Sequence, residues 1–257
     1  MEINPYEGTL HGGPPQPAEP KPSQFRSTLL GWLAVIGIVG LLVALLLPAM
    51  RRGAGPAAHR MQCANNLKQI GLALQSYADK YGALPPAHTV DAEGKPLHSW
   101  RTLILPFMEQ EPLFQKIDLS KPWDDPANEL AFHVATPGYV CPSANCPDTH
   151  TVYIAVAVPG GCFKPTDSRK LSEITDGQAS TLMVMEVDVS QAVHWMAPTD
   201  SINFDLLKPK SGAKLQHRNG YQAVFVDGSV HFLSIDLQPE TLRALITIDG
   251  KDVVGEY

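Results

Sequence analysis

A charge-free apolar run over residues 29–50 most limits what this chain can fold into. At a rise of about 1.5 Å per residue, a helix over this run is roughly 33 Å long, enough to cross a hydrocarbon core of about 30 Å. The apolar core of a secretion signal is shorter, about 7–15 residues, and ends at a small-x-small cleavage site. The sequence LLLPAMRR at the end of the run contains no such site. The sequence therefore predicts a retained transmembrane helix over residues 29–50.

The orientation of this helix is not settled by its flanking charges. Lys21 and Arg26 precede the run, whereas Arg51, Arg52 and Arg60 follow it. Counted directly, the positive-inside rule places the C-terminal domain in the cytoplasm by a small margin. The four cysteines favour the opposite orientation, because an even number of cysteines beyond a membrane segment fits an oxidising compartment.

The regions on either side of the apolar run differ in composition. Residues 1–28 contain six prolines and three glycines and few large apolar side chains, so we expect a disordered, proline-rich tail. Residues 51–257 are long enough for one domain with a hydrophobic core. The net charge of −6 argues against a nucleic-acid partner, because neutralising phosphates requires a basic surface.

A second helix is predicted after a break at Gly53, Gly55 and Pro56. Its apolar residues repeat at spacings of three and four and form one stripe, which Gly82 and the following prolines end. The polar residues between them, which include Asn66, are expected on the other faces. The stripe consists of Cys63, Leu67, Ile70, Leu74, Tyr77 and Tyr81.

The rest of the chain predicts short helices and antiparallel strands. Residues 99–115 read as a helix interrupted near Pro106 and Pro112. Strands are expected over residues 151–158 and 181–189, and two apolar runs flank Asp227-Gly228, a pair typical of two-residue hairpin turns. A short helix is expected over residues 239–246. This order of elements indicates an α+β domain in which the second helix packs on an antiparallel sheet.

Two groups of residues are candidates for metal ligands. Asp124, Asp125 and Asn128 supply oxygen ligands that suit calcium, although Asp-Asp-Pro is also ordinary turn chemistry. The second group, His217, Asp227 and His231, lies on or beside the last hairpin. There the simpler interpretation is that Asp227 makes the turn and the histidines lie at the surface or an edge.

Other chemistry has weak support. Glu186 and Asp188 alternate on one predicted strand, which fits an acid/base pair or, more simply, a solvated strand face. A zinc site built from the cysteines is an alternative to disulfides, but their spacing is not a paired C-x-x-C pattern. The sequence contains no G-x-S-x-G, H-E-x-x-H or phosphate-binding loop. We therefore expect no enzyme activity and no cofactor.

Several segments, taken in order, resemble one family. They are ALLLPA, RMQCANNLKQIGLALQSYADKYGALPPA, SWRTLILPFMEQEPLF, KPWDDPAN, YVCPS, ITDGQAST with MEV, and QAVFVDGSVHFLS. Together they resemble the planctomycete-type family of prepilin-like proteins with a C-terminal domain of unknown function, from residue 29 to about residue 255. The resemblance implies a type IV pilin-like helix that anchors in the cytoplasmic membrane, with the N-terminus inside and the domain in the periplasm or outside the cell.

The start of the helix departs from the family pattern. Thr28 matches, but Arg26 stands where the family has glycine and Gly31 where it has glutamate. A glutamate within a membrane helix normally needs a partner, such as the N-terminal amine of a neighbouring subunit. Without it that charge pair is not formed, so we expect the chain not to be processed as a standard prepilin.

The resemblance also bears on the cysteines and on function. Cys63 and Cys141 fall in family motifs and Cys146 and Cys162 do not, which implies the disulfide pairs Cys63–Cys141 and Cys146–Cys162. The expected role is a structural or interaction protein of a secretion or surface assembly, with membrane lipid and other pilin-like subunits or secretion components as partners. The alternative is a membrane-tethered binding module for a small ligand or calcium.

Overall fold

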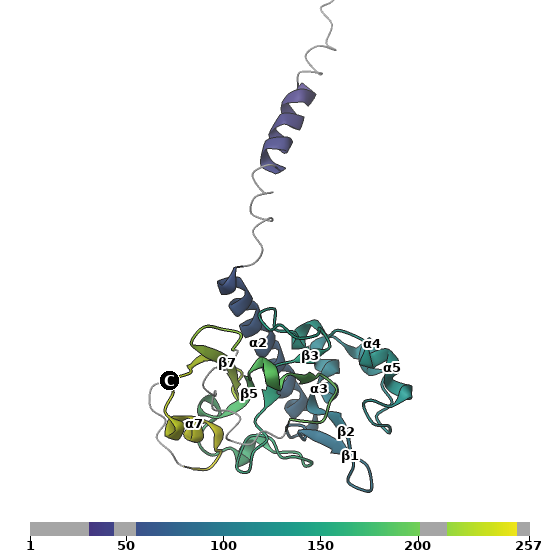
Figure 1. Cartoon of the computed structure of the whole chain (residues 1–257), viewed down its shortest axis with the longest axis vertical. Coiled ribbons are helices and arrows are strands. Elements are labelled where there is room, and N and C mark those ends of the chain that lie inside the picture. The colour runs from purple at the N-terminus through teal and green to yellow at the C-terminus, as the bar shows by residue number, and fades with distance from the viewer. Residues whose placement is uncertain (1–30, 44–54, 201–214, 251–257) are drawn as a thin grey trace, which may run out of the picture. The chain divides into compact units, whose positions relative to one another are not determined.

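The computed structural model describes residues 31–43, 55–200 and 215–250 (Figure 1). The chain divides into two compact units, Met1–Gly53 and Ala54–Tyr257. The proline-rich tail predicted over residues 1–28 lies outside the described residues.

The first unit contains a helix over residues 31–43. Its apolar side chains are exposed, with Trp32 at 68% and Ile36 at 63%. The remainder of the predicted transmembrane segment lies outside the described residues. Among the helices of the described ranges, none combines the length and the apolar character needed to cross a membrane.

The second unit begins with the long helix α2, Pro56–Tyr81. Pro56 opens it, and Gly82 ends it in the left-handed conformation at φ 79°. Four residues of the predicted stripe are fully buried, which confirms this part of it: Cys63, Leu67, Ile70 and Leu74. Tyr81, at the end of the stripe, is 58% exposed. The expectation that Asn66 lies on a polar face is wrong: it is 7% exposed, and its side-chain amide donates to the Val140 carbonyl at 2.8 Å.

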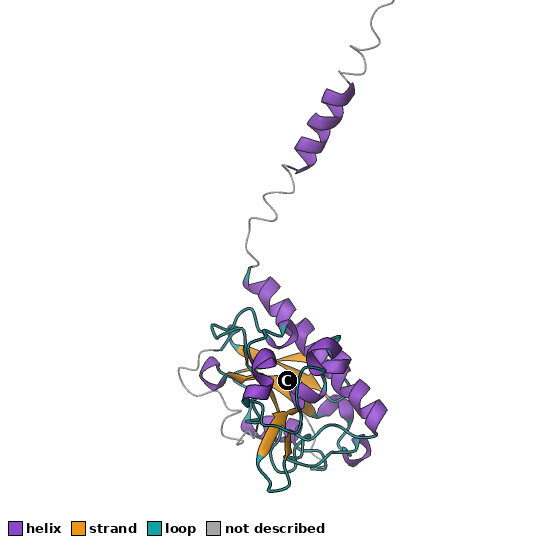
Figure 2. Ribbon diagram, turned by 90° about the vertical axis from the view of Figure 1, so that its right-hand side faces the viewer, coloured by secondary structure: helices purple, strands orange, loops and turns teal. Residues whose placement is uncertain are grey.

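A four-stranded antiparallel sheet forms the centre of the second unit, so the predicted α+β class with antiparallel sheets is confirmed. Its order is β4 (Tyr153–Ala155), β5 (Leu182–Glu186), β7 (Gly220–Phe225) and β8 (Val230–Ser234). Consecutive residues of β5 and β7 are all buried, which means that both faces of the sheet are covered. Helix α2 runs alongside the sheet and contacts β5, β7 and β8 (Figures 1 and 2).

The last hairpin has a longer turn than predicted. The Phe225 amide donates to the Ser229 carbonyl, which leaves Val226, Asp227 and Gly228 in the loop. Gly228 has φ +78°, whereas Asp227 has an ordinary negative φ. This is the three-residue loop with a left-handed glycine rather than the two-residue turn that Asp-Gly predicts. Helix α2 contacts this loop, because Lys68 Nζ donates to the Gly228 carbonyl at 2.7 Å and Gln75 Nε2 donates to the Val226 carbonyl at 2.9 Å.

Shorter elements surround this core. The interrupted helix over residues 99–115 is confirmed, since it forms α3 (Trp100–Leu103), η1 (Leu105–Met108) and α4 (Glu111–Phe114), and the predicted last helix is α7 (Pro239–Ile246). The strand predicted over residues 151–158 is split, with β3 (His150–Thr151) pairing with β6 (Val193–His194) and β4 joining the main sheet. A hairpin of β1 (His88–Val90) and β2 (Pro96–Ser99) was not predicted. The remaining elements are η2 (Pro126–Asn128), α5 (Glu129–Phe132), η3 (Pro137–Tyr139), η4 (Leu171–Glu173), η5 (Gln178–Ser180) and η6 (Val189–Gln191).

A fully buried ion pair joins α3 to the segment that follows β6. Arg101 Nη1 donates to Asp200 Oδ2 at 2.7 Å, and Nη2 donates to Asp200 Oδ1. Nη2 and Nε of Arg101 also donate to the Tyr153 carbonyl at 2.7 and 3.1 Å, and the Ser99 hydroxyl donates to Asp200 at 3.1 Å. Because both charges are buried, this pair is sensitive to the loss of either partner.

Replacing Gly71 with alanine should destabilise the domain. A Cβ at this position would lie 2.7 Å from Val224 Cγ2 on β7, so the Val224 side chain, α2 or the strand must move. We expect Gly71→Ala to lower the free energy of unfolding by about 1 kcal/mol or more, since overpacking costs about 1–3 kcal/mol and outweighs the gain in helix propensity. Urea denaturation of the full chain measures this. The exposed Ser76→Ala, which raises helix propensity without adding bulk at the sheet, is the control; equal effects would contradict the prediction.

Removing the charge of Asp200 should be costly. In Asp200→Asn the Arg101 guanidinium stays buried without its counter-charge, so we expect a loss of about 3–5 kcal/mol in the free energy of unfolding. The comparison is Lys164→Gln, which removes a 2.9 Å ion pair to Glu173 whose side chains are 33% and 36% exposed. An exposed pair contributes about 0–1 kcal/mol. Urea denaturation that gives similar losses for both variants would contradict this account.

Candidate functional site

Four side chains with polar or ionisable groups, from four separate segments, converge beside the N-terminal half of α2. Cys63 belongs to the buried stripe of α2, and Cys141 lies just after η3. Glu186 is the last residue of β5, and His217 lies in an isolated bridge with Gly220 before β7. All four residues are buried, with exposed fractions from 0% to 6%. We refer to Cys63, Cys141, Glu186 and His217 as the thiol cluster.

Local structure explains why these side chains point inward. The hydrogen bond from Asn66 to the Val140 carbonyl holds the segment of Cys141 against α2. Asn219 has φ 67°, and this left-handed residue turns the chain between His217 and β7. Pairing of Tyr153 with Glu186 in the sheet sets the position of the carboxylate at the end of β5.

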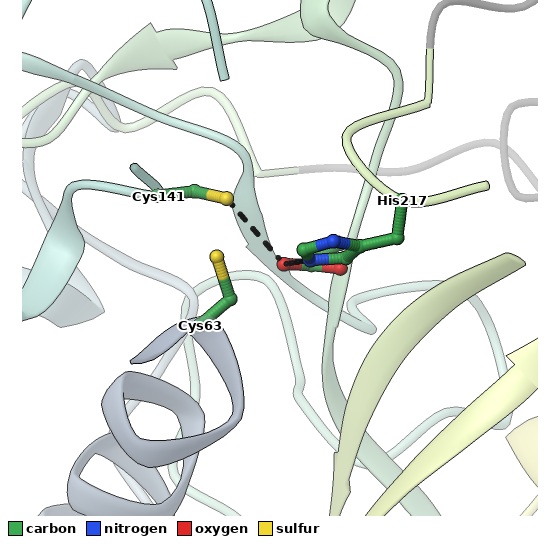
Figure 3. A group of neighbouring side chains, drawn as sticks. Cys63, Cys141 and His217 are labelled. Carbon is green, nitrogen blue, oxygen red and sulfur yellow. Dashed lines mark hydrogen bonds and ion pairs between the residues drawn. The ribbon is translucent and has the colours of Figure 1, made fainter. Parts of the chain in front are cut away.

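The potential ligand atoms of the thiol cluster all lie within 4.8 Å of one another. The Cys141 thiol donates to Glu186 Oε1 at 3.7 Å, and His217 Nε2 lies 3.3 Å from the same oxygen. The other carboxylate oxygen of Glu186 accepts a hydrogen bond from the backbone amide of Gln222 at 2.7 Å. Figure 3 shows the side chains of Cys63, Cys141 and His217 pointing toward one another from α2 and two loops.

The environment favours charge separation within the cluster. The Cys141 thiol lowers the pKa of Cys63 against the effect of burial, and His217 and Tyr153 act in the same direction. Cys63 in turn raises the pKa of Cys141, together with burial and Glu186. Burial by itself lowers the pKa of His217, but hydrogen bonds to Cys63 and Glu186 raise it to about 9. Cys63 is thus the more acidic thiol, next to a readily protonated imidazole.

A pocket gives access to one side of the cluster. Its volume is about 480 Å³, and His217 and Gln222 line it together with Arg60 and Met61. The Arg60 guanidinium stacks over the Phe232 ring at 3.6 Å, which positions a cation at this pocket. The pocket therefore reaches the His217 side of the cluster.

The chemistry of such a cluster is limited to a few possibilities. Two neighbouring thiols can form a disulfide, and thiols with an imidazole and a carboxylate are the ligands that zinc prefers. Catalysis by the thiolate would need a substrate to reach a sulfur that is fully buried.

The match to known proteins covers only part of this site. Residues 52–157 match the family described as "Protein of unknown function (DUF1559)". This supports the domain-of-unknown-function part of the resemblance found in the sequence. Comparison with curated proteins and with solved structures gives no significant match. The DUF1559 match includes Cys63 and Cys141 but ends before Glu186 and His217.

The predicted disulfides are not formed in the structure, where all four cysteines are free. Cys63 and Cys141, inside the DUF1559 match, are neighbours in the thiol cluster as their predicted pairing requires. Cys146 is partly exposed, whereas Cys162 is fully buried. The expectation of two disulfides is therefore corrected to a pair of adjacent thiols and two further thiols.

The proposed calcium ligands, which also lie in the DUF1559 match, serve the local turn. Asn128 is buried, and its amide bonds to the backbone of Asp118 and Pro122. Asp125 caps η2 by accepting the Ala127 amide at 2.9 Å. Asp124 and Asp125 line a surface pocket of about 320 Å³, in which Asn128 takes no part.

The other candidate groups are separated. Asp227 accepts the amide and hydroxyl of Ser229 within the hairpin turn, as the simpler interpretation expects, and His231 is exposed on β8. His217 instead joins the thiol cluster. Glu186 is 1% exposed, so the interpretation that it lies on a solvated strand face is wrong. Asp188 lies beyond β5, where its side chain caps η6.

The thiol cluster is not visible as a set in the sequence. Cys63 and Cys141 are predicted as a pair, whereas His217 and Glu186 fall in two other candidate groups. The four positions are separated by 78, 45 and 31 residues, so no spacing motif links them. The one local signal is Glu186 itself, a carboxylate that ends an otherwise apolar, fully buried strand.

The cysteines should react in the order of their exposure. We expect iodoacetamide to alkylate Cys146 first in the reduced, folded protein, because its side chain is partly exposed. Cys162 should react last, since it is fully buried and burial raises its pKa to about 12. Peptide mass spectrometry at timed intervals measures the order, with the urea-unfolded protein as the control. Faster alkylation of Cys162 than of Cys146 would contradict the structure.

Proposed function

We propose that this protein is a non-enzymatic, single-pass membrane protein with a pilin-like domain that serves a structural or interaction role in a secretion or surface assembly. In this proposal residues 29–50 anchor the chain in the cytoplasmic membrane. The N-terminus lies inside, and the domain lies in the periplasm or outside the cell. Its partners are membrane lipid and other pilin-like subunits or secretion components.

One observation carries the proposal. A charge-free run long enough to span a bilayer is followed closely by the 26-residue helix α2, which packs one face on an antiparallel sheet. This order, an apolar N-terminal segment and then a long helix on a sheet, is what a pilin-like subunit requires. The first turns of α2 are largely exposed, with Met61 at 67%, which leaves surface for contact with other subunits.

The absence of enzymatic motifs in the sequence agrees with a structural role. The buried thiol cluster has the geometry of a structural site, because all four of its side chains are withdrawn from solvent. The departures at Arg26 and Gly31 indicate that assembly does not use the charge pair of standard pilins.

Membrane attachment should depend on the apolar run. We expect the full chain to remain in the membrane fraction after a carbonate wash. The double variant Ile36→Arg and Leu41→Arg should shift it to the soluble fraction, since each charge near the centre of a span costs about 2.5–3.5 kcal/mol or more. Immunoblotting of the fractions measures this. The matched control is Ile36→Val with Leu41→Val, and a soluble wild-type chain would contradict the proposal.

The orientation is read from Cys146 in the same cells. A membrane-impermeant maleimide, applied after mild reduction, should label the wild-type chain in intact cells and fail to label Cys146→Ser. Labelling that requires cell lysis would place the domain in the cytoplasm and overturn the external role.

A further inference from the structure

We propose that Cys63, Cys141, Glu186 and His217 together bind one zinc ion. The site would hold its metal with four protein ligands, as structural zinc sites do, and would tie α2 to the sheet and to two loops. This inference is independent of the membrane anchor and of the assembly role proposed above.

The donor set matches zinc. Two sulfurs, one imidazole nitrogen and one carboxylate oxygen make up three donor types, all of which zinc accepts. The combination excludes magnesium and calcium as preferred ions, because those prefer oxygen ligands alone. The structure brings the four donors together from segments far apart in the chain, at the edge of a largely apolar core.

The distances within the cluster also fit zinc. Zinc–sulfur bonds of about 2.3 Å and zinc–nitrogen bonds of about 2.0–2.1 Å place the ligands of a tetrahedral site roughly 3.3–3.8 Å apart. The Cys141 Sγ–Glu186 Oε1 separation is 3.7 Å and the His217 Nε2–Glu186 Oε1 separation is 3.3 Å. Since all the donor atoms lie within 4.8 Å of one another, small side-chain rotations complete the tetrahedron.

The charges of the cluster also fit zinc. Glu186 is buried, and its ion-pair partner in the described part of the chain is His217, which carries a positive charge when Nε2 is protonated. Binding of a divalent ion to Nε2 in place of the proton keeps a cation beside the buried carboxylate. Zinc binding replaces the thiol protons and any proton on His217 Nε2, and the released protons pass to solvent. The divalent ion then balances most of the negative charge that the two thiolates and the carboxylate carry.

The surroundings hold the ligands in place. The backbone amide of Gln222 donates to Glu186 Oε2 at 2.7 Å, which leaves Oε1 facing the sulfurs and the imidazole. Asn66 fixes the backbone beside Cys141, and its amide also lies 3.5 Å from the Tyr153 hydroxyl. Partners of this kind orient the ligands of metal sites. The pocket lined by His217 and Gln222 supplies the entry path.

A disulfide between Cys63 and Cys141 is the competing interpretation. It would use two of the four side chains and would leave Glu186 and His217 as a buried ion pair with no further role. Zinc accounts for all four positions at once. The two states are mutually exclusive, because a disulfide sulfur is no longer a thiolate ligand.

The test uses the full chain in detergent micelles, reduced and freed of metal. Titration with cobalt(II) should saturate at one ion per chain and produce the visible absorption of tetrahedral cobalt with a near-ultraviolet thiolate charge-transfer band. Zinc should displace the cobalt, raise the melting temperature and protect Cys63 and Cys141 from iodoacetamide, while Cys146 stays reactive. The chelator EDTA should reverse each effect.

Variants assign the ligands. Cys63→Ser, Cys141→Ser and His217→Gln should each weaken zinc binding by roughly 100-fold or more, and the cysteine variants should lose charge-transfer intensity. Cys146→Ser, which removes a thiol outside the cluster, is the matched control and should bind as the wild type does. Circular dichroism checks that each variant folds. If a variant does not fold, the protection that zinc gives Cys63 and Cys141 against alkylation in the wild type still tests whether zinc binds these two thiols.

Two results would overturn the proposal. One is a reduced wild-type chain that gives no tetrahedral cobalt spectrum, or gives one that persists in the Cys63→Ser, Cys141→Ser double variant. The other is a Cys63–Cys141 disulfide in the chain as isolated from its native compartment. Failure of the membrane or topology experiments would not produce either result, so the two proposals fail separately.

Discussion

The close approach of α2 to the central sheet is the contact on which the rest of the domain depends. Gly71 brings the helix backbone against Val224 on β7, and there is no room for even a methyl group between them. The apolar stripe on either side of Gly71 then packs on the strands. Because this packing fixes the distance between the helix and the sheet, it also determines which side chains of the two layers can contact one another.

Polar groups at this boundary are satisfied in ways that lock the two layers together. Lys68 and Gln75 bind carbonyls of the last hairpin loop, and Asn66 binds the backbone before Cys141. Deeper in the domain, Arg101 links Asp200 to the Tyr153 carbonyl. Tyr153 pairs with Glu186 in the sheet, so the buried ion pair and the thiol cluster are anchored on the same strand pair. These polar contacts make the arrangement specific, whereas the apolar core supplies most of its stability.

A metal at the thiol cluster would act on the same boundary. Cys63 belongs to α2, Glu186 to the central strand β5, and Cys141 and His217 to the segments that flank them. A bond network through one ion would close loops of 78, 45 and 31 residues and so restrict the unfolded chain far more than the native one. Such a cross-link would serve the role that disulfides serve in secreted proteins.

Local patterns in the sequence were sufficient for several elements. The spacing of the apolar residues identified α2, the prolines identified the breaks between α3, η1 and α4, and α7 was found with its bounds. Turn chemistry located the last hairpin but not its loop length, because Asp-Gly also fits a three-residue loop with the glycine in the left-handed conformation. The β1–β2 hairpin was not predicted, because its strands are short and contain polar residues such as His88 and Thr89.

The apolar run, the α+β class and the helices α2, α3, α4 and α7 follow from the sequence alone, because each depends on residues close together in the chain. Only the tertiary structure decided that Glu186 and His217 join Cys63 and Cys141, that Asn66 is buried, and that Arg101 and Asp200 form an ion pair. The reason is physical. Helix and strand periodicities act over a few residues, whereas a buried polar cluster is assembled by the packing of segments that no local pattern relates.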